Sequence, residues 1–193
     1  MNRSPLLAPL LGFAALLIQG CAAAVVGGAA TTAVLAADPR TAGTIMDDQM
    51  IEFQIREAFY DNPELSKQSH LNVTSYNNKV LLTGEAPTEA IGQRLEALAH
   101  GVPKVRSVHN EVTIAAPSSS LTRSSDSWIT AKVKSRLAAS TKAAAINIKV
   151  VTENGTVYLM GLTSREQADE ATEIARQTSG VQRVVRVFEY TDG

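Results

Sequence analysis

The feature that most constrains the fold is an internal repeat. Residues 72–84, NVTSYNNKVLLTG, align without a gap with residues 149–161, KVVTENGTVYLMG, and five positions are identical. Residues 101–108, GVPKVRSV, likewise match residues 180–187, GVQRVVRV, at four positions. The chain is therefore two copies of one unit of roughly 65 residues, and the elements expected in one copy are expected in the other.

Each copy shows the same order of elements. Apolar residues recur every four positions at the start of each copy, which predicts a helix of about three turns: Ile51, Ile55 and Phe59, then Ile129, Val133 and Leu137. Two β-rich segments follow around Asn77-Asn78 and Asn154-Gly155, which are hairpin-turn sequences. A second helix (residues 88–100 and 164–178) and a β-branched strand complete each copy.

The order helix-strand-strand-helix-strand predicts an α+β fold. Two helices cover one face of a three-stranded sheet in each tandem domain. Units this small bury little apolar surface, so we expect the two copies to pack against each other. We place the first domain at residues 47–115, a Pro- and Ser-rich linker at 116–124, and the second domain at 125–191.

The beginning of the chain has the pattern of an exported lipoprotein. Residues 1–20 have a positive start and a short apolar run, which predicts a signal peptide. Cys21, the only cysteine, follows in LIQGC and resembles a bacterial lipobox, which implies acylation of Cys21 and a tether over residues 21–46. Ala22 is not the Asp that retains enteric-type lipoproteins at the inner membrane, so the pattern implies the outer membrane, facing the periplasm. An ordinary secretory signal with an incidental cysteine is the alternative.

Charge and motif content exclude several classes of function. The net charge is −1, which lacks the basic excess that nucleic-acid binding needs. The three histidines, His70, His100 and His109, fall on three expected elements with no cysteine partner, so we expect no metal site. No catalytic constellation or cofactor motif is evident either, so we expect a protein that is not an enzyme and has no cofactor.

The repeated motifs carry a family resemblance. The segments VLLTG with GVPKVRSV, and VYLMG with GVQRVVRV, resemble the BON domain. A lipobox followed by two such domains resembles the dual-BON outer-membrane lipoproteins. The resemblance implies phospholipid binding, support of outer-membrane integrity, contact with anionic lipid through the second domain, and enrichment at division sites.

The stretch around the only tryptophan is the candidate binding site. On a helix whose inward stripe is Ile129, Val133 and Leu137, the outward face carries Trp128, Ala131, Lys132, Lys134 and Ser135. An indole beside lysines suits the interface of an anionic membrane. We therefore expect these residues to bind phosphatidylglycerol or cardiolipin. The alternative for Trp128 is packing in the cleft between the two domains.

A second class of function remains open at this point. The first domain is acidic, with ten acidic and six basic residues between Thr44 and Pro117. This domain, or an exposed sheet edge, could bind a protein of the outer-membrane assembly machinery. The chain would then be a protein-binding adaptor rather than a lipid-binding protein.

Overall fold

The computed structural model describes residues 38–141 and 147–192 of the 193-residue chain. The signal peptide, Cys21 and most of the tether lie outside the described residues. Residues 39–193 form one compact unit that contains both repeats. Within the described residues, no helix is both long enough and apolar enough to cross a membrane.

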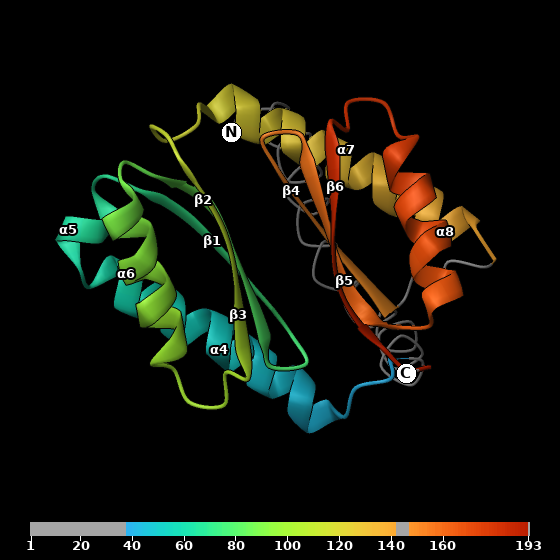
Figure 1. The fold of residues 1–193 in the computed structure, drawn as a ribbon, viewed down its shortest axis with the longest axis horizontal. Helices are drawn as coiled ribbons and strands as arrows, with labels where there is room; N and C mark the ends of the chain where they lie inside the picture. Colours follow the sequence, from blue (N-terminus) through green and yellow to red (C-terminus); the bar gives the residue numbers. More distant parts are fainter. Residues whose placement is uncertain (1–37, 142–146, 193) are drawn as a thin grey trace, which may run out of the picture. The chain divides into compact units, whose positions relative to one another are not determined.

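Both repeats adopt the expected order of elements. The first domain consists of α4 (Ala42–Tyr60), α5 (Pro63–Ser66), β1 (His70–Tyr76), β2 (Lys79–Ala86), α6 (Glu89–His100) and β3 (Ser107–Ile114). The second consists of α7 (Ser120–Ala139), β4 (Ile148–Glu153), β5 (Thr156–Thr163), α8 (Arg165–Arg176) and β6 (Arg183–Tyr190). The α+β prediction is confirmed (Figure 1). Sequence reasoning missed the one-turn helix α5, and α7 begins upstream of the tryptophan segment, at Ser120.

The sheets are mixed. The order is β1-β2-β3 in one and β4-β5-β6 in the other. The first two strands of each sheet are antiparallel and are joined by a tight turn, whose central residues have positive φ: Asn77 (53°), Asn78 (63°), Asn154 (48°) and Gly155 (72°). The third strand runs parallel to the second. A parallel pair needs a crossover connection, which α6 and α8 supply.

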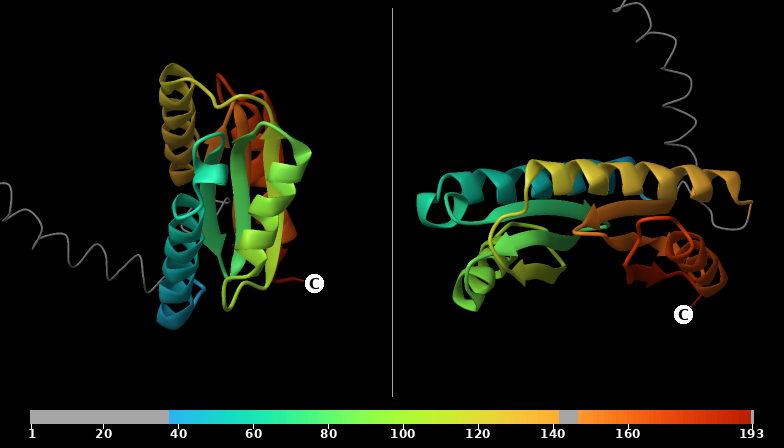
Figure 2. Two further views of the ribbon diagram at one scale, coloured as in Figure 1. Left: turned by 90° about the vertical axis from the view of Figure 1, so that its left-hand side faces the viewer. Right: turned by 90° about the horizontal axis from the view of Figure 1, so that it is seen from above.

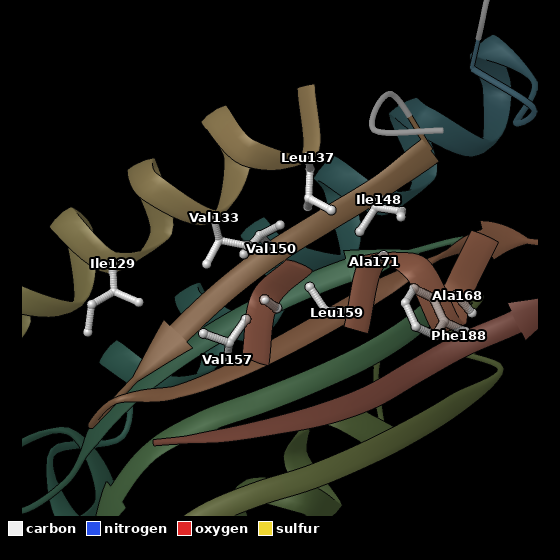
Figure 3. Packing of buried hydrophobic residues seen from close by; sticks show 11 residues of the cluster. Ile129, Val133, Leu137, Ile148, Val150, Val157, Leu159, Ala168, Ala171 and Phe188 are labelled. Atoms are coloured by element: carbon white, nitrogen blue, oxygen red, sulfur yellow. The ribbon is translucent and has the colours of Figure 1, made fainter. Parts of the chain in front are cut away.

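Each sheet packs one face against its two helices. In the second domain, the inward residues of α7 meet side chains of β4, β5 and α8 (Figure 3). Val133 of α7 and Leu159 of β5 are fully buried there. In the first domain, Ile55 of α4 and Leu82 of β2 occupy the corresponding positions. The helix stripes predicted from the sequence are therefore the core-facing stripes.

The opposite faces of the two sheets pack against each other. The buried cluster at this seam consists of Tyr76, Leu81, Tyr158, Met160 and Val187. Successive side chains of a strand point to opposite faces, so β2 and β5 contribute alternate residues to the domain core and to the seam. Both strands are therefore buried almost continuously, and the two copies pack together through their sheets.

Two strand glycines permit close pairing. Gly84 lies within β2 and Gly161 within β5, each two residues before the end of its strand. A Cβ on Gly84 would collide with the backbone carbonyl of His70, and one on Gly161 with that of Asn147. The shared glycine therefore reflects close backbone approach by the preceding strand.

Candidate binding surface on helix α7

Helix α7 is held in place at its first turn and along its inward face. The Ser119 side chain accepts a hydrogen bond from the Thr122 amide at 3.2 Å, which satisfies one free N–H of the helix start. Ile129, Val133 and Leu137 are buried in the core. This stripe determines which side chains of α7 face the solvent.

Buried Asp126 ties α7 to the hairpin of its own domain. Its carboxylate accepts hydrogen bonds from the backbone amides of Asn154 and Gly155, both at 2.9 Å. The equivalent residue of the first domain, Asp48, accepts from the amides of Asn77 (2.9 Å) and Asn78 (2.8 Å). Sequence reasoning missed this pair. The available signal was the spacing, because Asp48 and Asp126 precede Ile51 and Ile129 by the same three residues.

The predicted lipid-binding residues lie on the outward face of α7. Trp128 is 71% exposed, and Ala131, Lys134 and Ser135 are also exposed. Lys132 is half-buried, and its ammonium group donates to the backbone carbonyl of Ser179. Lys134 makes no hydrogen bond or ion pair with another described residue, so its charge is available to a partner.

The exposure of Trp128 bears on the packing alternative. In the described structure the buried apolar cluster between the two sheets includes Tyr158 and Met160 but not Trp128. The indole lies instead beside a surface hollow of about 520 Å³, whose walls include Lys132, Gly155 and Gln182. Trp128 therefore does not pack between the two domains.

Leu121 is a surface residue that the sequence reasoning left out. It is 81% exposed and precedes Trp128 by seven residues, which places the two within about 20° on the same side of the helix. The linker expected from the sequence, residues 116–124, includes Leu121. The observed start at Ser120 adds an apolar residue to this face.

Helices α4 and α7 lie on the same side of the paired sheets (Figure 2). Among the described residues, six of the seven exposed large apolar side chains belong to these two helices: Met46, Met50, Phe53, Tyr60, Leu121 and Trp128. Exposed apolar groups concentrated in this way indicate an interaction surface. This side of the unit is therefore the strongest candidate for contact with a membrane or a protein.

Two buried carboxylates at the seam have opposite pKa shifts. Burial tends to raise the pKa of Glu85, but hydrogen bonds from Asn154 and Ser118 and the charge of His70 outweigh it, so the net pKa is lowered. Burial raises the pKa of Glu153, and nearby Glu85 adds to the rise. The surroundings of Glu85 therefore favour its charged form, whereas those of Glu153 disfavour it.

The domain comparison defines the class of protein. The BON domain model matches residues 47–116 and 125–192, which is more than half of the chain. The chain therefore belongs to the BON domain family, with two copies of the domain.

The relatives narrow this class. The chain is 42% identical to Outer membrane lipoprotein DolP of Haemophilus influenzae, with 100% of both chains covered. It is 40% identical to the 21 kDa hemolysin of Actinobacillus pleuropneumoniae, with 79% of each chain covered. The chain is thus a DolP-like dual-BON lipoprotein, lipid-anchored at the outer membrane. Neither relative is named as an enzyme.

Proposed function

We propose that this protein is an acylated periplasmic lipoprotein that binds anionic phospholipid through α7 and supports outer-membrane integrity, with enrichment at division sites. The observation that carries the lipid-binding proposal is the exposed indole of Trp128 on α7, together with Lys134, which is exposed on the same helix and makes no hydrogen bond or ion pair with another described residue. Catalysis has no part in this function. Phosphatidylglycerol and cardiolipin are the headgroups that this surface suits.

The membrane anchor and α7 have separate tasks in this proposal. Acylated Cys21 attaches the protein to the membrane. Stable anchoring takes two membrane-binding groups, such as two acyl chains, and acylated Cys21 carries several chains. Each lysine near a charged leaflet contributes only about 1 kcal/mol. Weak binding is sufficient for a tethered protein, since the anchor raises the local lipid concentration. Binding by α7 then determines that the anchored protein accumulates where anionic phospholipid is enriched.

Flotation with liposomes tests the lipid-binding proposal. A fragment of residues 39–193, which is the compact unit, lacks the anchor and reports on the folded part alone. We expect it to float with liposomes containing phosphatidylglycerol or cardiolipin and not with phosphatidylethanolamine alone. Trp128→Glu abolishes flotation, whereas Ile114→Glu, at an exposed apolar position outside α4 and α7, does not. Unimpaired flotation of folded Trp128→Glu would overturn the role of α7.

A protein-binding adaptor is the second candidate function. The outward face of α4 favours it, because Met46, Met50, Phe53 and Tyr60 are more than half exposed and follow one side of the helix. A partner from the outer-membrane assembly machinery would dock on this stripe. Photocrosslinking from Phe53 in intact envelopes would then give a discrete protein adduct that persists in Trp128→Glu. Adducts with lipid alone would count against the adaptor.

A further inference from the structure

A histidine and two carboxylates converge where the two domains meet. His70 begins β1 and is the cross-strand partner of Glu85 in β2, while Glu153 ends β4 of the second domain. The His70 Nδ1 atom lies 3.2 Å from Glu85 Oε2 and 3.9 Å from Glu153 Oε1. One donor atom from each of the three residues lies within 4.8 Å of the other two.

Neighbouring side chains orient the two carboxylates. Glu85 Oε1 accepts a hydrogen bond from the side-chain amide Nδ2 of Asn154 at 2.5 Å. Glu153 Oε2 accepts from Asn72 Nδ2 at 2.7 Å and from Thr83 Oγ1 at 3.3 Å.

The other oxygens, Glu85 Oε2 and Glu153 Oε1, lie towards His70, and Glu85 Oε2 also accepts from the Ser118 backbone N–H at 3.2 Å. Hydrogen bonds to the carboxylate oxygen that does not face the ion typically orient a metal ligand.

Burial and access also suit a bound cation. The Glu85 and Glu153 side chains are 2% and 5% exposed, and that of His70 is 24% exposed. Two buried carboxylates close to a single imidazole leave a net negative charge when the imidazole is neutral. A cavity of about 460 Å³ that includes His70 and Glu153 in its lining gives entry from solvent and room for a water ligand.

We propose that His70, Glu85 and Glu153 bind a divalent transition-metal ion, of which Zn²⁺ fits best. Imidazole nitrogen and carboxylate oxygen are both zinc ligands, and three protein ligands with a fourth position open to water are the arrangement of catalytic zinc sites. Magnesium and calcium prefer oxygen ligands alone. Bonds of 2.0–2.2 Å in a tetrahedron place donor atoms about 3.4 Å apart. The two distances from His70 Nδ1, 3.2 and 3.9 Å, are close to this value, and the two carboxylate donors lie within 4.8 Å of each other. Because Glu153 belongs to the second domain, the ion links the two domains.

Metal titration of the full chain tests this proposal. The protein is purified from membranes in non-ionic detergent, treated with EDTA and titrated with ZnCl₂. We expect one Zn²⁺ per chain by equilibrium dialysis and a rise in Tm of roughly 5–10 °C at a hundredfold excess over Kd. Co²⁺ in the same site gives visible absorption bands typical of four-coordinate cobalt, a readout independent of stability.

Matched variants distinguish this site from other ligands. Glu153→Gln keeps an oxygen that accepts from Asn72 but removes the negative charge, and it abolishes both the Tm rise and the cobalt bands. His100→Gln retains them, although His100 also lies near a carboxylate, Glu96, at 3.9 Å.

Two results would overturn the proposal. One is the absence of stoichiometric Zn²⁺ binding by the wild type. The other is equal Zn²⁺ binding by folded Glu153→Gln. In either case the three residues form only a polar cluster that links the two domains.

Discussion

Helices α4 and α7 open the two repeats and show what duplication kept and what it changed. Both present three large apolar residues to their own sheet, and both use a buried aspartate to bind the turn of the following hairpin. The inward sides are thus nearly equivalent. Packing against the same sheet leaves little freedom for these residues to change.

The outward sides of the two helices differ. Met50 of α4 occupies the repeat position of Trp128 of α7, and Gln54 that of Lys132. Arg56, at the position of Lys134, lies 3.6 Å from Glu52 of its own helix, whereas Lys134 has no such partner among the described residues. One helix therefore presents an apolar stripe with compensated charge, and the other an indole with a free cation. The difference predicts that α4 and α7 meet different partners.

The largest expected effect concerns the shared aspartates. Asp48→Ala leaves the amides of Asn77 and Asn78 and the Ser75 hydroxyl without their acceptor, and should lower the free energy of unfolding by about 2–4 kcal/mol. Asp126→Ala removes the acceptor of two amides and should cost slightly less, about 1–3 kcal/mol.

Urea unfolding measures both losses. Asp47→Ala is the control because its side chain is more exposed and pairs with exposed Lys104, so the expected loss is below about 1 kcal/mol. Equal values for Asp47 and Asp48 would contradict the structural role assigned to the buried aspartate.

The next largest effect is on lipid binding and distinguishes the outward face of α7 from that of α4. Trp128→Glu should weaken binding to anionic liposomes by about 2 kcal/mol or more, at least roughly 30-fold, because it removes a large apolar group and adds a negative charge. Met50→Glu places the same charge at the equivalent position of α4 and should change binding less than threefold. Quantitative flotation of residues 39–193 compares them. Equal losses would mean that both helices contact the bilayer.

A smaller effect on liposome binding distinguishes the two lysines of α7, Lys132 and Lys134. Lys134→Gln removes a free charge and should weaken binding about fivefold, which corresponds to about 1 kcal/mol. Lys132→Gln should weaken it only about twofold, since the Lys132 ammonium already donates to the Ser179 carbonyl. Flotation at low ionic strength measures both. A larger loss at Lys132 would show that this side chain leaves Ser179 when lipid binds.

The last effect concerns the salt dependence of binding by the wild type. Raising the ionic strength from 0.01 M to 0.15 M shortens the screening length from about 30 Å to about 8 Å. Binding through Lys134 should therefore weaken several-fold, while the contribution of the Trp128 indole persists. Flotation of wild type and Lys134→Gln across this range checks the point. A salt dependence that Lys134→Gln leaves unchanged would assign the electrostatic attraction to other residues.

The tertiary structure adds contacts that periodicity does not reveal. The sequence shows that His70 and Glu85 lie on successive strands, but their pairing depends on the hairpin register. Glu153 joins them only because the two sheets pack face to face. Likewise, the sequence indicates that Trp128 lies off the core stripe, yet its exposure depends on which surfaces the two domains bury.

The sequence by itself determined the duplicated α+β fold, the hairpin turns and the inward stripes of the helices. These features follow from local periodicity, from turn residues that tolerate positive φ, and from the need to bury apolar side chains. Only the tertiary structure decided that the sheets form the seam and that α4 and α7 share one side. It also decided that His70, Glu85 and Glu153 meet. The physical reason is that packing between two sheets depends on the complementarity of whole surfaces, which no short segment specifies.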